Sequence, residues 1–192
     1  NLFILFILII FILWNTFNNA FIGGTSDLEP HAYSLWYLKD SLVKYHYIPQ
    51  WTSDFYGGKP YLGLYQPGSF FLLLPISLIF GGTLTPKIAI LVVSLLSTFF
   101  FYLLAKKLFK SNLVVLFSTI LFTVFPNRLA LTNGGTLADL TAITFIPLAF
   151  YTYEKIKESP RLRNLALLGL IQGLALLTHH AVGGSLLVAL IL

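Results

Sequence analysis

Most of the side chains that could do chemistry lie in one polar stretch, residues 23–67, of an otherwise apolar chain. The stretch carries four of the seven acidic residues, two of the four histidines and two of the three tryptophans: Asp27, Glu29, Asp40, Asp54, His31, His46, Trp36 and Trp51. Carboxylates and imidazoles act as general acids and bases, and carboxylates also hold metal ions. Asp27 and His31 are one helical turn apart. The same Asp27 could instead cap a helix.

A second candidate carboxylate is Asp139, which lies about a turn inside an apolar run. A carboxylate within a membrane span costs a few kcal/mol or more, so it usually faces a cavity or a partner. A first-turn acid that the helix dipole stabilises explains the same residue.

The run Asn133-Gly134-Gly135-Thr136 precedes that apolar run, so we expect it to open a helix. Free backbone N–H groups at a helix start, together with the dipole, can bind phosphate. Arg128 could add a bidentate clamp. Asp139 would repel the phosphate unless a divalent cation lay between them. A plain turn would use the same glycines.

Aromatic and histidine side chains provide further binding candidates. Trp51 and Tyr65 could stack on a sugar, although aromatic residues also gather at membrane interfaces. His31 could bind substrate or simply lie in the interface. His179 and the adjacent His180 follow an apolar run, where they could bind a ligand or mark the boundary of the membrane.

The composition defines the setting of these residues. The chain is 57% hydrophobic and 10% charged, whereas soluble domains carry roughly 25% charged residues. We therefore expect an all-α integral membrane protein. The chain has no Met, starts at Asn1 and ends inside an apolar run, so we expect residues 1–192 to be the N-terminal part of one transmembrane domain. The net charge of +5 is better explained by helix orientation in a lipid bilayer than by nucleic-acid binding.

Hydropathy predicts a multi-span helical bundle. Spans are expected over 2–22, 88–105, 113–125, 137–153, 165–177 and from 181 onward. Residues 30–45 are predicted to form a surface helix, 48–67 an irregular docked loop and 127–136 a polar loop. The apolar segment 70–80 is too short to span and contains Pro75, so we expect it to stay on one side.

This count predicts the side of each loop. Lys106, Lys107 and Lys110 share a side with Lys155, Lys157, Arg161 and Arg163. By the positive-inside rule that side is cytoplasmic. Residues 23–87, 127–136 and 179–180 then lie on the external side. We therefore expect a multi-pass protein of the plasma (inner) membrane with loop 23–67 outside.

Several short motifs together resemble a known family. They are D-x-x-x-H (Asp27, His31), P-x-W (Pro49, Trp51), F-Y-G-G-x-P (55–60), Y-x-P (Tyr65, Pro67), A-K-K-L-F (105–109), N-G-G-T-L-A-D-L (133–140) and F-I-P-L (145–148). The pattern resembles the 6-pyruvoyl-tetrahydropterin synthase-related membrane proteins, which belong with the GT-C-type glycosyltransferases. The resemblance covers nearly the whole chain and is most specific over residues 27–67.

The resemblance implies a substrate and a mechanism. The donor would be a sugar on a polyprenyl phosphate, and the acceptor would be used on the external face. Asp27 matches the position of the catalytic acid, and Asp139 matches a second external acidic motif. Either carboxylate could instead hold a divalent cation, Mg²⁺ or Mn²⁺. The protein mannosyltransferases, which also belong with the GT-C-type enzymes, have an adjacent pair of acids at the first position. This chain departs from that pattern because Leu28 separates Asp27 from Glu29, and because the second loop has one acid.

Eight further residues are predicted to bind phosphate or substrate: Arg128, Gly134, Gly135, Thr136, His31, Trp51, Tyr65 and His179. Two alternative functions use the same fold. The first is a flippase for a polyprenyl-linked lipid, and the second is a non-catalytic membrane assembly protein. The predicted spans carry no basic residue and the charges gather at one face, which favours interfacial chemistry over transport.

Overall fold

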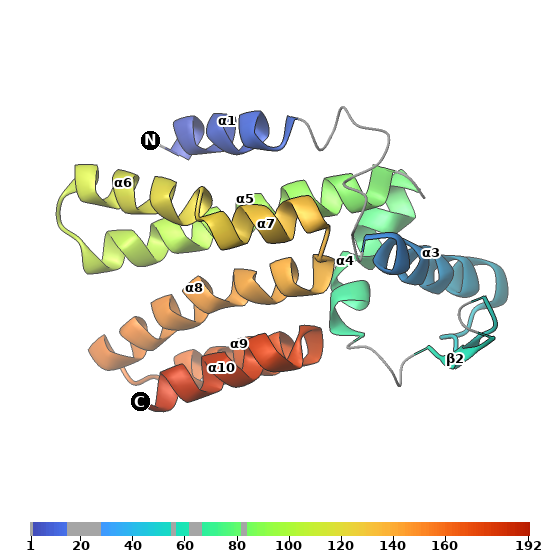
Figure 1. Cartoon of the computed structure of the whole chain (residues 1–192). Coiled ribbons are helices and arrows are strands. Elements are labelled where there is room, and N and C mark those ends of the chain that lie inside the picture. Colours follow the sequence, from blue (N-terminus) through green and yellow to red (C-terminus); the bar gives the residue numbers. More distant parts are fainter. Residues whose placement is uncertain (1, 15–27, 55–56, 62–66, 82–83) are drawn as a thin grey trace.

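The computed structural model describes residues 2–14, 28–54, 57–61, 67–81 and 84–192. Long helices lie side by side along one axis, and short elements cluster at one end of them (Figure 1). The bundle consists of α1 (Leu2–Ile12), α5 (Leu84–Leu108), α6 (Asn112–Thr123), α7 (Pro126–Gly134), α8 (Leu137–Glu158), α9 (Leu162–Thr178) and α10 (His180–Ile191). The chain reverses direction between α5 and α6, between α7 and α8, and again at α9 and at α10, because short connections join these helices, whereas α7 continues α6 (Figure 1).

The helix α8 is the centre of the bundle. It packs extensively against both α5 and α9, and α10 packs on α9. A buried apolar cluster from α8, α9 and α10 contains Ala149, Ile171, Ala175 and Leu186. A larger cluster joins α1, α3, α4, α5 and α8. The larger cluster therefore connects the long helices to the elements at the end of the bundle.

Length and composition identify few membrane spans within the described ranges. α5, with 25 residues, is long and apolar enough to cross a membrane. α6 and α7 pass the same test together, but they are bent by 41° at a short break. α1, α4, α9 and α10 are shorter apolar helices. The multi-span arrangement predicted from the sequence thus remains a prediction.

The prediction of a polar loop over residues 127–136 is wrong, because most of this segment is α7. Pro126 starts the helix at a position where proline is favourable, since its missing N–H needs no partner there. The polar side chains find partners inside the bundle. For example, Thr132 Oγ1 donates to the Arg128 carbonyl at 2.9 Å. The polar residues Arg128 and Thr132 are therefore buried and hydrogen-bonded, while Asn127 and Asn133 lie on the exposed side of the helix.

The surface helix is α3 (Leu28–Tyr45), which starts two residues before the predicted Pro30. Proline is tolerated there because the first four N–H groups of a helix lack intrahelical partners. His31, Leu35 and Leu38 form its buried face. The hairpin that follows pairs β1 (Trp51–Thr52) with β2 (Lys59–Pro60) in antiparallel register, with Trp51 opposite Pro60. This short pairing orders part of the loop that we expected to be irregular.

The short apolar segment is the 13-residue helix α4 (Gly68–Phe80), which continues through Pro75. It lies across the direction of the long helices, next to α3 (Figure 1). Its first residue packs tightly on the end of α9, because a Cβ on Gly68 would stand 2.5 Å from the Leu177 carbonyl oxygen. Glycine at position 68 is therefore required by a backbone–backbone contact.

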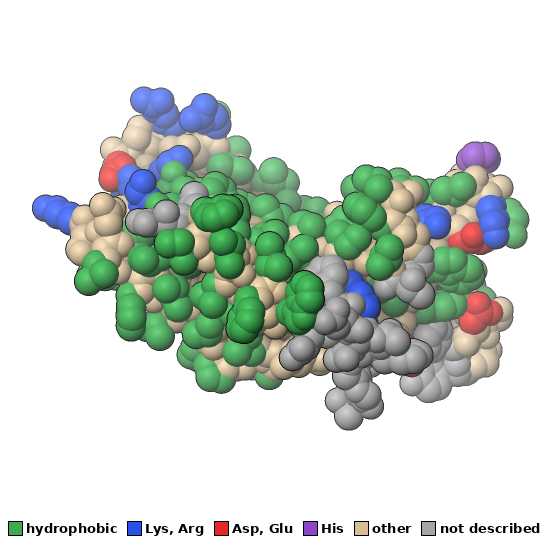
Figure 2. Space-filling model, turned by 90° about the horizontal axis from the view of Figure 1, so that it is seen from above, with side chains coloured by type: hydrophobic (Ala, Val, Ile, Leu, Met, Phe, Trp, Pro, Cys, Tyr) green, Lys and Arg blue, Asp and Glu red, His purple; other side chains and the backbone are tan. Residues whose placement is uncertain are grey.

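The bundle has two chemically different ends. The basic end holds the α5–α6 and α8–α9 connections with Lys106, Lys107, Lys110, Lys155, Lys157, Arg161 and Arg163. The loop end holds α3, the hairpin, α4, the α7–α8 turn and the α9–α10 joint (Figure 1). In Figure 2, Lys and Arg side chains gather at the left end, and hydrophobic side chains cover much of the surface between the two ends. This grouping agrees with the predicted sides, but the orientation in a membrane stays a prediction.

Candidate functional site

The described residues place one carboxylate and one imidazole in contact at the loop end. Asp139 lies in the first turn of α8, and His179 lies at the joint between α9 and α10. The distance from His179 Nε2 to Asp139 Oδ1 is 3.2 Å. The two side chains are 22% and 23% exposed, so both are accessible from outside the bundle. Two residues that the sequence placed on one face are thus direct neighbours.

His179 also starts α10. Its backbone is extended, and its Nδ1 accepts a hydrogen bond from the Val182 N–H at 3.4 Å. The backbone N–H of His179 in turn donates to the Ala175 carbonyl at the end of α9. From the sequence, His179 is a candidate ligand or boundary marker, and no sequence feature points to its contact with Asp139. The sequence feature that indicates its capping role is the position of the histidine directly before an apolar helix, where helix-capping residues occur.

The turn between α7 and α8 uses the amides that we expected to bind phosphate. Gly135 ends α7 in the left-handed conformation with φ of 68°. Its N–H donates to the Thr132 carbonyl at 3.2 Å, and the N–H of Thr136 donates to Leu131 at 3.2 Å. These bonds form a helix C-cap. The premise that the amides of Gly135 and Thr136 are free is therefore wrong, and Gly134 belongs to α7 itself.

The same turn holds the start of α3. A Cβ on Gly135 would stand 2.5 Å from the Leu28 Cβ, so the two residues pack closely. Leu28 directly follows Asp27 in the sequence, and Gly135 precedes Asp139 by four residues. The start of α3 and the turn before α8 thus meet at this contact. Asp27 itself lies outside the described residues, and so does Tyr65.

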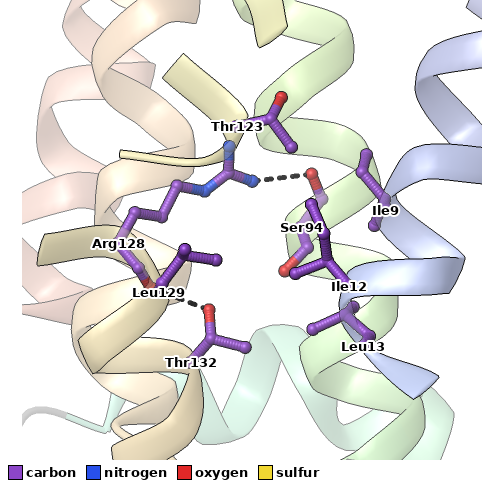
Figure 3. Close-up of a pocket in the computed structure, with 8 residues that line it drawn as sticks. All are labelled: Ile9, Ile12, Leu13, Ser94, Thr123, Arg128, Leu129 and Thr132. Carbon is purple, nitrogen blue, oxygen red and sulfur yellow. Dashed lines mark hydrogen bonds between the residues drawn. The ribbon is translucent and has the colours of Figure 1, made fainter. Parts of the chain in front are cut away.

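Arg128 is buried between helices and not at the loop-end surface. It is 6% exposed, and its Nη2 donates to the Ser94 carbonyl on α5 at 2.8 Å (Figure 3). Its Nη1 donates to Thr98 Oγ1 at 3.2 Å, and the guanidinium lies 4.8 Å from the centre of the Phe122 ring. Arg128 lies outside the runs that the sequence predicts as spans, but α7 passes the length-and-composition test for a span together with α6, and this bent pair includes Arg128.

A small cavity next to Arg128 is lined by four apolar and four polar residues (Figure 3): Ile9, Ile12, Leu13, Leu129, Ser94, Thr123, Arg128 and Thr132. Its volume is about 10 Å³. That is close to the space one water needs. This cavity is far too small to form a path for a lipid head group.

His31 and Trp51 lie in different environments. His31 is 3% exposed, and its ring meets Phe70 of α4 edge-on, with centroids 5.9 Å apart. Trp51 is 55% exposed, and its indole covers Gly58, where a Cβ would come within 2.5 Å of the ring. His31 therefore joins α3 to α4, and of the two only Trp51 presents an accessible ring.

The hairpin is fixed to α3 through Tyr33. The Tyr33 hydroxyl donates to Asp54 Oδ2 at 2.6 Å and lies 2.7 Å from Thr52 Oγ1. Burial, followed by the hydrogen bond to Asp54, raises the pKa of Tyr33 to about 12. The phenol therefore stays protonated and keeps donating at neutral pH.

Among the described residues, no group of three or more His, Cys, Asp or Glu side chains could hold a metal ion. Asp139 offers one carboxylate, of which His179 contacts Oδ1. Magnesium sites are commonly built from one or two carboxylates and the phosphate oxygens of a substrate. Asp139 fits a cation of that kind, with the remaining ligands supplied by the substrate and other groups.

A largely helical chain with a candidate span and with a partly exposed carboxylate at one end fits the membrane glycosyltransferases of the GT-C type. Residues 65–192 match the model of the dolichyl-phosphate-mannose-protein mannosyltransferase family. This match covers well over half of the chain, and the chain belongs to that family. Searches of curated proteins and of solved structures found no match. The narrower resemblance to the 6-pyruvoyl-tetrahydropterin synthase-related proteins remains a prediction.

Proposed function

We propose that the protein transfers a sugar from a polyprenyl-phosphate donor to an acceptor at the loop end. The main support is the position of Asp139, a partly exposed carboxylate at the end where α3, α4 and the hairpin gather. Family membership supports a transferase of this class. The contact between Leu28 and Gly135 supports a shared site for Asp27 and Asp139, because it joins the segments that carry them.

In the proposed reaction an acceptor hydroxyl or amine attacks C1 of the sugar. Asp27 is the general base, and its carboxylate takes the proton that the acceptor loses. A new bond forms from the acceptor to C1, while the bond between C1 and the phosphate oxygen breaks. The polyprenyl phosphate leaves with that electron pair, and in-line displacement inverts the configuration at C1.

Asp139 acts with Asp27 in the proposed site. A divalent cation, when bound, would offset the charge of the leaving phosphate. Asp139 would supply one of its oxygen ligands. Trp51 gives the sugar or the acceptor an exposed ring to stack on, since its indole lies over Gly58 with its outer side accessible.

The proposal includes an orientation of the bundle. The basic end would face the cytoplasm, because Lys and Arg concentrate there. The loop end would then lie at the external surface, where a lipid-anchored donor can present its sugar. A flippase is less well supported, since the cavity beside Arg128 has room for about one water. A larger hollow at Phe101, Phe122 and Pro126 has no charged residue in its lining that could bind a lipid head group.

The test is a transfer assay with the full-length protein in proteoliposomes. Radiolabelled dolichyl phosphate mannose is the donor probe, and label that moves to membrane-protein or glycan fractions is counted. Asp27→Asn is compared with Asp40→Asn, an acid of α3 that pairs with Lys44 at 2.9 Å. We expect transfer by the wild type and Asp40→Asn, and a loss of about 100-fold or more for Asp27→Asn. Equal turnover by Asp27→Asn and wild type would remove Asp27 from the mechanism.

A further inference from the structure

The joint between α9 and α10 fixes the direction of the His179 ring. As the residue before α10, His179 accepts the Val182 N–H through Nδ1. A ring nitrogen that accepts a hydrogen bond carries no proton. In the neutral imidazole the proton is therefore on Nε2, the atom that faces Asp139.

That tautomer makes the contact with Asp139 directional. Nε2–H donates to Oδ1 of the carboxylate across 3.2 Å. The ring cannot turn over without giving up the Val182 bond, so the donor stays pointed at Asp139. One orientation of the imidazole thus links the first turn of α10 to the first turn of α8.

We propose that His179 is a positioning residue that holds the Asp139 carboxylate in one orientation for the transfer reaction. The inference rests on the proposed function, and it gives His179 a role other than substrate binding. The hydrogen bond occupies Oδ1 and fixes the plane of the carboxyl group. The second oxygen then keeps a constant direction for the substrate or for a cation. Such supporting contacts typically change activity by about 10–100-fold when they are removed.

Two substitutions separate the cap from the contact with Asp139. The amide of His179→Asn lies near the place of Nδ1, and Asn is a strong N-cap, but it is too short to reach Asp139. The amide of His179→Gln lies near the place of Nε2, so it restores a donor to Asp139 while it loses the cap. The exposed neighbour His180 gives a matched control, His180→Asn.

The experiment measures kcat and KM for transfer from dolichyl phosphate mannose by the full-length protein, with thermal unfolding of each variant. We expect His179→Asn to unfold near the wild-type temperature and to lose about 10–100-fold in kcat with little change in KM. His179→Gln should unfold at a lower temperature and recover most of kcat. His180→Asn should match the wild type.

Asp139→Asn separates failure of this inference from failure of the proposed function. If Asp139→Asn is inactive while His179→Asn is fully active, the positioning role is wrong and the site stands. The role is also wrong if His179→Gln and His179→Asn lose kcat equally, since the effect is then structural. If Asp139→Asn turns over like the wild type, the proposed site itself fails and His179 has no carboxylate to position.

Discussion

The two ends of the bundle hold their charged groups in different ways. At the basic end, exposed ion pairs join Lys107 to Glu158 and Lys157 to Glu154. Exposed pairs of this kind contribute about 0–1 kcal/mol each. At the loop end, Asp139 is partly buried and faces an imidazole whose direction the backbone of α10 sets. The basic end is therefore suited to orientation, and the loop end to directed chemistry.

The largest expected difference between the two ends is the side of the membrane that each faces, because a cysteine either is or is not labelled from outside the cell. The chain has no Cys, so single cysteines can replace the exposed residues Lys110 and Asn133. A membrane-impermeant thiol reagent on intact cells should label Asn133→Cys, and Lys110→Cys only after permeabilisation. Labelling of both from one side would contradict the proposed orientation.

Removing one acid at each end tests which end of the bundle carries the catalytic site. Asp139→Asn should lower kcat for transfer by about 100-fold or more. Glu158→Gln removes only an exposed partner of Lys107, so activity should stay within a factor of about two. The measurement is initial transfer rate per folded protein. A comparable loss in both variants would mean that general charge, rather than a site, supports activity.

The turn beneath α3 can be tested with two neighbouring glycines. Gly135→Ala puts a side chain at φ of 68° and against Leu28. Left-handed strain and overpacking together should cost about 2–4 kcal/mol of unfolding free energy. A Cβ on Gly134 would have no atom within 4 Å, so Gly134→Ala should change the free energy of unfolding by less than about 1 kcal/mol. Denaturant unfolding in detergent measures both, and equal effects would rule out the close contact.

Arg128 lies between the two ends, and its substitution tests whether this buried cation stabilises the helix packing or binds the donor phosphate. Arg128→Lys cannot reproduce the two-pronged contact with Ser94 and Thr98, so unfolding free energy should fall by about 1.5–3 kcal/mol. Arg161→Lys at the basic end should cost less than about 0.5 kcal/mol. We expect KM for the donor to be unchanged in folded Arg128→Lys. A large rise in KM would instead favour a phosphate clamp.

The smallest effect concerns the hairpin. The pKa of Tyr33 rises from 10.0 to about 12 on folding, so its contribution to stability is complete below pH 10. That contribution is lost as the pH rises toward 12. Tyr33→Phe should therefore lower the free energy of unfolding by about 1 kcal/mol or less at pH 8. Above pH 10 the free energy of unfolding of this variant should fall less steeply with pH than that of the wild type. Tyr45→Phe, on the exposed end of α3, is the control. An unchanged pH profile in Tyr33→Phe would assign the decline to other groups.

The sequence predicts the helices better than it predicts the contacts between them. α5, α8, α9 and α3 were found because their apolar faces and boundary residues act locally. α7 was missed because its polar residues are satisfied by distant partners, such as Ser94 for Arg128. The pairing of Asp139 with His179 was also hidden, since it depends on how α8 and α10 pack. The glycine turn was mistaken for a helix start because the same residues also end helices.

The tight contact of Gly68 with Leu177 and Thr178 has a consequence during synthesis. α4 can complete its packing only after α9 has left the ribosome, because no residue before position 177 provides that surface. At about 5–20 residues per second, translation reaches α9 roughly 5–20 seconds after Gly68. During that interval α4 can pack against α3, α5 and α8 but not against α9. Its first turn, at Gly68, is therefore the part of this helix that packs last.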